Sequence, residues 1–299
     1  MLAWFFVNFS SCIEIMKPIL TTYFFVLVCL GGWSQETLIS LEADMVRQLN
    51  TIRSAESDED IRTAGDSLHL LMTDALNTKG CWEYPFEKLE SMNTMYSPDE
   101  AFRLFNWNLS WMDQTHSYYC FVLTRDKKIG IYDWVELKQP NRMPTKIENR
   151  YLSPEDWLGC LYYQIIPVSK GKRTYYTMLG WDGNDKLTTK KIIDVLAWQG
   201  DEIRLGAPIF KTEKANPKRV IMEYASDVMV SMRYHEREKR IVHDHVAPRD
   251  PMMDGVYSFY GPDMTFDAWN LEKGKWILVE NVDIRLGRDG KHFNDPREN

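Results

Sequence analysis

The sequence predicts an α+β protein, in which an N-terminal helical hairpin precedes a large antiparallel β-meander domain of sandwich-like or barrel-like form. Before about residue 97, apolar residues recur at the spacing of a helix face. After residue 98, short apolar runs alternate with polar turns, and no long amphipathic helix interrupts them, which argues against alternating βα winding. The expected organisation is therefore a leader at 1–35, helices at 36–97, a β domain at 98–290 and a polar tail at 291–299.

The leader is predicted from residues 16–35, which have the features of a secretory signal peptide. Lys17 supplies a positive start, an apolar run of about a dozen residues follows, and small residues precede Gln35. Residues 1–15 have no cation before their apolar residues, so Met16 is expected to be the true start. An uncleaved membrane anchor and a lipoprotein modified at Cys29 are the open alternatives. Export to the periplasm, cell envelope or medium is the expectation, with no membrane span left after cleavage.

The helical hairpin is predicted over Glu36–Thr78. An apolar stripe from Leu38 to Ile52 marks the first helix, and Ser57, followed by three acidic residues, is expected to cap the second. Gly80 is a stop signal. A third, shorter helix is expected where Phe86, Leu89 and Met92 recur at helical spacing.

The β domain is predicted from repeated pairs of apolar runs separated by short polar turns, which is typical of hairpins. The expected turns are at 125–128, 169–172, 199–201, 236–239 and 272–274. A propeller remains an alternative, although about a dozen strands would give only three blades, and closed propellers need four. Residues Lys138–Ser153 are expected to form a long surface loop, followed by one helical turn at Ser153–Asp156.

Composition narrows the range of partners and compartments. The chain has a net charge of −7, so electrostatics gives it no reason to bind nucleic acid. Aromatic residues are abundant at 13%, which fits either cross-strand packing or a face that binds sugar or peptide. Three cysteines follow the leader (Cys81, Cys120 and Cys160), so they allow at most one internal disulfide, and buried free thiols are equally compatible.

Several segments carry a resemblance to a known group of proteins. They are Leu161–Pro167, Tyr175–Asn184, Gly206–Phe210 and Phe259–Asp263. On these residues the chain resembles a family of uncharacterised secreted proteins of the Bacteroidota, over most of the region from Ala101 to Asp283. The resemblance implies export from a Gram-negative cell, and it implies no activity or catalytic residue.

A loop after one predicted strand offers a possible calcium site. Trp181, Asp182 and Asn184 bracket Gly183, and closely spaced oxygen side chains around a glycine can ligate Ca²⁺. No bidentate Glu follows at EF-hand spacing. The alternative is an ordinary tight turn, because Gly and Asn both tolerate positive φ.

A second candidate is a His-x-His pair. His243 and His245 would lie on one side of a regular strand and could converge on a cation such as Zn²⁺, with Asp250 or Asp254 as a third ligand. The same alternation also fits a plain strand with one wetter face.

A third candidate is an aromatic cluster before a Gly-Pro turn. Tyr257, Tyr260 and Asp263 could form a stacking platform for a sugar or peptide. The alternative is a strand end with its turn.

The chain has no GxSxG motif, no HExxH motif and no glycine-rich phosphate loop. The function expected from the sequence is therefore an exported, non-enzymatic module that binds a glycan, a peptide or an envelope protein. A secreted hydrolase that uses carboxylates or a histidine-bound metal, and a structural envelope component, are the alternatives.

Overall fold

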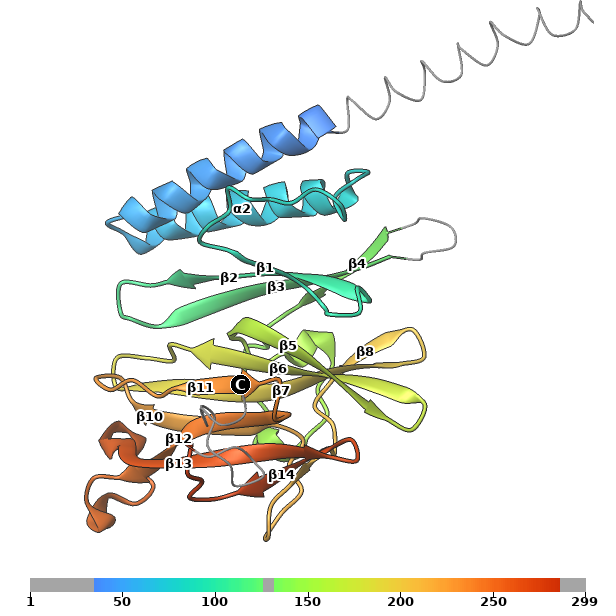
Figure 1. Ribbon diagram of the computed structural model, residues 1–299. Helices are drawn as coiled ribbons and strands as arrows, with labels where there is room; N and C mark the ends of the chain where they lie inside the picture. Colours follow the sequence, from blue (N-terminus) through green and yellow to red (C-terminus); the bar gives the residue numbers. More distant parts are fainter. Residues whose placement is uncertain (1–34, 126–131, 286–299) are drawn as a thin grey trace, which may run out of the picture.

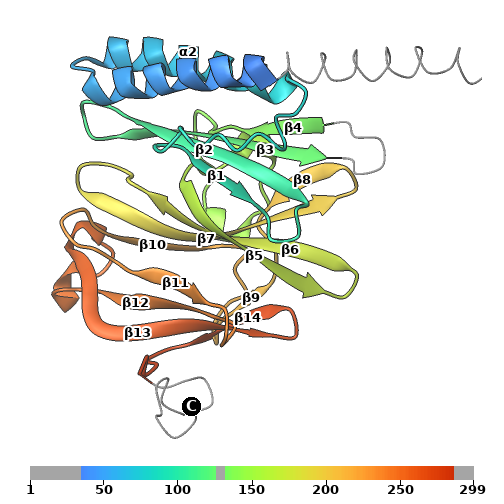
Figure 2. The same cartoon turned by 45° about the horizontal axis from the view of Figure 1, so that its top comes forward.

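The protein is built of four stacked layers in a computed structural model that describes residues 35–125 and 132–285. A pair of helices covers one face of a first antiparallel sheet, and two further sheets follow beneath it (Figures 1 and 2). The predicted α+β class, with a helical hairpin before an antiparallel β region, is confirmed. The predicted leader, apart from Gln35, and the predicted tail at 291–299 lie outside the described residues.

The helical hairpin consists of a helix over residues 35–54 and α2 (Asp58–Asn77). Ser57 caps α2 as predicted, because its hydroxyl accepts a hydrogen bond from the Asp60 amide at 3.2 Å. Three acidic residues in the first turn complement the positive end of the helix dipole. Within the described residues, neither helix combines the length and the apolarity needed to cross a membrane.

The helix-side sheet has the strand order β1-β2-β3-β4. Its strands are β1 (Asn93–Tyr96), β2 (Phe102–Ser110), β3 (His116–Arg125) and β4 (Tyr132–Leu137). Strand β1 lies inside the segment 36–97 that the sequence assigns to helices, so the β structure begins earlier than predicted.

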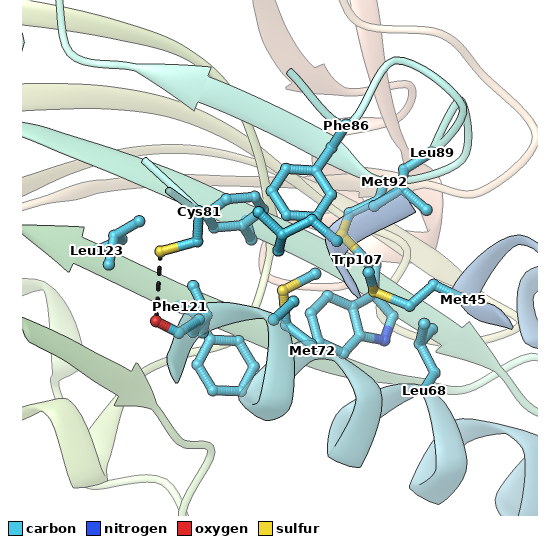
Figure 3. Close-up of a cluster of buried hydrophobic side chains, with 14 of the residues drawn as sticks. Met45, Leu68, Met72, Cys81, Phe86, Leu89, Met92, Trp107, Phe121 and Leu123 are labelled. Carbon is cyan, nitrogen blue, oxygen red and sulfur yellow. Dashed lines mark hydrogen bonds between the residues drawn. The ribbon is translucent and has the colours of Figure 1, made fainter. Parts of the chain in front are cut away.

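The core between the helices and this sheet is shown in Figure 3. Met45, Leu68 and Met72 from the two helices meet Trp107 and Phe121 from the sheet, and all five side chains are fully buried. One such buried side chain truncated to alanine typically costs about 2–5 kcal/mol. The helices are therefore an integral layer of the fold.

The predicted third helix around Phe86–Met92 does not form: the segment makes two single turns, closed by the Leu89 amide on the Phe86 carbonyl at 3.3 Å and the Met92 amide on the Leu89 carbonyl at 3.0 Å. A buried arginine holds the chain just before this segment. Arg103 is buried, and its guanidinium donates to four main-chain oxygens at 2.6–3.2 Å: those of Cys81, Trp82, Tyr84 and Pro85. Phe86 also has a φ of 54°, outside the right-handed helical region.

The middle sheet has the order β10-β7-β6-β5, with β8 also paired to β7. The strands are β5 (Leu161–Lys170), β6 (Arg173–Asp182), β7 (Thr188–Gln199), β8 (Glu202–Leu205) and β10 (Val220–Ala225). Between the first two sheets run the predicted surface loop and two short 3₁₀ turns, η1 (Ile147–Asn149) and η2 (Pro154–Asp156), the second at the predicted helical turn.

The outer sheet has the order β11-β12-β13-β14-β9. Its strands are β9 (Phe210–Lys211), β11 (Met232–His235), β12 (Arg240–Pro248), β13 (Tyr260–Glu272) and β14 (Lys275–Val279), and β9 pairs with β14 in parallel. Two 3₁₀ turns, η3 (Pro251–Met253) and η4 (Tyr257–Phe259), precede β13. The strands of every predicted hairpin are paired, although the turn predicted at 125–128 lies, apart from Arg125, outside the described residues. The sheets are stacked face to face rather than arranged as propeller blades (Figure 1).

Two further cores join the three sheets. Phe102, Tyr162 and Met178 are among the buried residues between the helix-side and middle sheets, and Phe210 and Trp276 are among those between the middle and outer sheets. Cys81, Cys120 and Cys160 are all buried as free thiols. Burial raises the pKa of the Cys81 thiol to about 11, so it stays protonated at neutral pH.

Candidate functional site

The loop between β6 and β7, predicted as a turn or a calcium site, is closed by its own hydrogen bonds. Asp182 Oδ1 accepts from the Asn184 amide at 2.8 Å, and Asn184 has the positive φ of 52° expected of a turn residue. Asn184 Nδ2 donates to Thr188 Oγ1 at 2.6 Å, and Lys190 Nζ lies 3.5 Å from Asp182 Oδ2. The oxygens that would ligate a cation therefore already have partners within the loop.

The helix-side sheet covers this loop. The Tyr118 hydroxyl accepts a hydrogen bond from the Gly183 amide at 2.7 Å, and the His116 ring packs edge-on against Trp181 with centroids 5.8 Å apart. A Cβ atom on Gly183 would lie 2.3 Å from His116 Nε2, so any larger residue here would force the His116 ring to move. The loop is a joint between two layers.

The two predicted metal-binding histidines have different environments. His243 is buried and its Nδ1 donates to the Asp244 carbonyl at 2.9 Å, whereas His245 is partly exposed and its Nδ1 lies 2.8 Å from Asp267 Oδ2. Burial lowers the pKa of His243, and the hydrogen bond to Asp267 raises the pKa of His245. The β12–β13 register shifts between Asp244 and Val246, so the regular alternation assumed in the prediction is not kept.

Asp250, the predicted third ligand, has a local role. Its Oδ1 accepts from the Met252 amide at 2.9 Å and so caps η3. Across residues 35–125 and 132–285, no group of three or more His, Cys, Asp or Glu side chains is arranged to hold a metal ion. The structure therefore does not bring the three predicted ligands together.

The predicted aromatic platform is partly assembled. Tyr257 and Tyr260 are ring neighbours, with centroids 5.1 Å apart at 56°, and Tyr257 is 45% exposed. The Tyr260 hydroxyl donates to Asp254 at 2.6 Å, which raises the pKa of the phenol. Asp263 accepts from the Thr265 side chain and amide, and these bonds lower the pKa of its carboxyl group. These residues do not line the cavities described next.

Two cavities lie in a groove at the end of the middle sheet, where β6 begins and β7 ends. The groove has two chambers that share Tyr151 and Arg204. The first chamber, of about 590 Å³, is lined by the 151–156 loop and by residues 201–204. The second, of about 410 Å³, is lined by residues 173–175, 197–199 and 206–208. Both volumes are within the range of small-molecule sites.

A buried ion pair fixes one wall of this groove. Arg219 Nε lies 3.0 Å from Asp194 Oδ1, and both side chains are fully buried. Arg219 Nη1 also donates to the Ile147 and Arg150 carbonyls, so it fixes the loop just before Tyr151. Leu152, just after it, exchanges two main-chain hydrogen bonds with Leu205 at 2.9 and 3.0 Å.

Tyr151 is thus an exposed aromatic side chain on a rigid backbone. Its side chain is 47% exposed, although the main chains of Arg150 and Leu152 on either side are held by hydrogen bonds. Two cations lie over its ring, Lys218 Nζ at 4.7 Å and the Arg204 guanidinium at 5.9 Å from the centroid. A preorganised aromatic side chain next to an exposed guanidinium group, here that of Arg204, is a typical feature of ligand sites.

The two chambers differ in charge. The larger contains three carboxylates, those of Asp156, Asp201 and Glu202, together with Arg204. The smaller contains Arg173 and Arg204 and no carboxylate, alongside Tyr175 and Trp198. Sequence reasoning missed this groove, since it is assembled from four separated segments and no motif marks it. The only sequence signal was the general richness in aromatic residues.

Comparison of the chain with models of known protein families, with curated proteins and with solved structures gives no match. The site is therefore interpreted from its own geometry.

Proposed function

We propose that the protein is an exported, non-enzymatic module that binds a ligand in the groove around Tyr151. The observation that carries this proposal is the exposed Tyr151 ring, held on a backbone fixed by the buried Arg219–Asp194 pair between two chambers. A buried ion pair contributes little net stability, because the cost of desolvating the two charges roughly cancels their attraction. Positioning Tyr151 is a reason to keep the pair.

Export is supported by the signal-like segment at residues 16–35 and by the resemblance to secreted proteins of the Bacteroidota. Expression of the full chain in a Gram-negative host, followed by mass spectrometry of the periplasmic fraction, tests this step. We expect a mature chain that begins near Gln35. Full-length protein retained in the cytoplasm would contradict it.

Ligand binding is tested by screening the purified mature protein on a glycan array and a peptide array. The matched variants are Tyr151→Ala in the groove and Tyr257→Ala at the sequence-predicted platform, because the two tyrosines are 47% and 45% exposed. We expect Tyr151→Ala alone to abolish the hits. Loss of the hits with Tyr257→Ala alone would move the site to the platform, and the absence of hits on both arrays would favour a structural envelope component.

One observation favours the alternative of a hydrolase: the hydrogen bond between His245 and Asp267, an arrangement that orients histidine bases in several enzymes. If this pair is catalytic, the wild-type protein hydrolyses ester or glycoside substrates and His245→Ala does not. We expect neither protein to show activity.

A further inference from the structure

We propose that the ligand of the groove is a sugar acid, whose carboxylate lies between Arg173 and Arg204 and whose ring packs on the aromatic side chains of the smaller chamber. This inference rests on the proposed function and names the chemical class of its ligand. It uses only the residues that line the groove.

The smaller chamber concentrates positive charge on an acidic protein. Both of its ionic side chains are arginines, although the chain as a whole has a net charge of −7. Arg173 and Arg204 make no ion pair with any described residue, and the ring contact of Arg204 with Tyr151 leaves its N–H donors free. Two exposed guanidinium groups in one concavity attract an anion.

Arginine also indicates the kind of anion. The planar fork of N–H donors matches a carboxylate or a phosphate through two parallel hydrogen bonds. Phosphate and carboxylate share this chemistry, so the walls of the chamber must distinguish them. Tyr151, Tyr175 and Trp198 offer aromatic surface for the apolar face of a ring, and Thr174 and Gln199 offer hydrogen bonds for hydroxyl groups. A ring that carries both hydroxyls and a carboxylate uses all of these groups.

The larger chamber restricts which sugar unit can be linked to the sugar acid in a ligand that spans both chambers. Asp156, Asp201 and Glu202 can accept hydrogen bonds from sugar hydroxyls, but they repel a second carboxylate. A ligand that spans both chambers past Tyr151 therefore has one acidic unit next to a neutral or amino sugar. A run of consecutive sugar acids does not fit this charge pattern.

Calorimetric titration of the mature protein tests the inference with four probes: D-glucuronate, D-glucose, inorganic phosphate and trigalacturonate. We expect D-glucuronate to bind at least tenfold more tightly than the other three. Arg173→Gln and Arg204→Gln should each lower its affinity by about tenfold or more, the scale of a charge-assisted hydrogen bond. Lys186→Gln is the control, since it removes one exposed positive charge at the far end of the β6–β7 hairpin.

Three results would overturn the inference. Equal affinity for D-glucose and D-glucuronate would show that the charge is not used. Phosphate binding as tight as D-glucuronate binding would define an anion site without sugar selectivity. No binding of D-glucuronate would exclude the proposed class. These results leave the proposed function to its own test. That test requires only that array ligands, charged or neutral, lose binding in Tyr151→Ala.

Discussion

The two ends of the β6–β7 hairpin differ in whether their polar side chains are paired. At one end, Asp182 and Asn184 satisfy each other and their neighbours within a closed loop. At the other end, about 30 Å away along a ten-residue strand, Arg173 and Trp198 line an open groove. The closed end looked like a binding site in the sequence, and the open end carried no recognisable motif.

The difference shows why residue type alone does not define a site. Acidic and amide side chains close together in sequence readily bond one another, and they then form turns and joints between layers. Tyr151 and Arg204, by contrast, are separated by 53 positions in the chain and meet only in the fold.

The largest expected loss of stability is at the open end, where Arg219→Met would leave Asp194 buried without its charge partner. Such a change typically lowers the free energy of unfolding by about 3–5 kcal/mol. The comparison at the closed end is Lys190→Met, whose partly exposed pair with Asp182 is expected to contribute about 1 kcal/mol or less. Urea unfolding of both variants is the measurement, and equal losses would remove the difference between the two ends.

Gly183→Ala tests the closed end as a joint between layers. The new methyl group would lie 2.3 Å from His116 Nε2, and overpacking of this kind typically costs about 1–3 kcal/mol. In a His116→Ala background the same change should be nearly neutral, because the clash is gone. Urea unfolding of the four proteins of this cycle would reveal the coupling. A cost that persists without His116 would point to backbone strain instead.

The two histidines of β12 should give opposite pH dependences. The hydrogen bond to Asp267 raises the pKa of His245, so this pair stabilises the fold below the unfolded-state pKa of about 6.5, and the contribution is lost as pH rises through the raised value. Burial lowers the pKa of His243, so its contribution is present above the unfolded-state pKa and is lost as pH falls through the lowered value.

The measurement is the free energy of unfolding of wild type, His245→Gln and His243→Gln at several pH values. Relative to wild type, His245→Gln should be weakest at acid pH and His243→Gln weakest at neutral pH. Parallel pH profiles for the two variants would contradict the assigned environments.

The smallest expected effect on stability is that of Tyr151→Ala. The ring is exposed and its backbone is held by other residues, so the free energy of unfolding should change by only about 0.5 kcal/mol, as for most surface positions. A loss of several kcal/mol, measured by urea unfolding, would make Tyr151 a packing residue and would weaken the case for the groove.

Local patterns in the sequence predicted much of the fold. The cap at Ser57, the hairpins and the helical turn at Pro154 all depend on residues close together in the chain. The sequence did not indicate that Arg103 would bind the carbonyls of residues 81–85, or that β9 would pair with β14, because these contacts join distant segments. The groove was missed for the same reason.

The most direct test of the central claim compares the indole N–H signals of Trp198 and Trp181 in an NMR titration with D-glucuronate. Each signal is assigned by its loss in the matching Trp→Phe variant. We predict that the Trp198 signal shifts with increasing sugar while the Trp181 signal stays in place. A shift of Trp181 with Trp198 unmoved would place the ligand at the closed end and contradict the account.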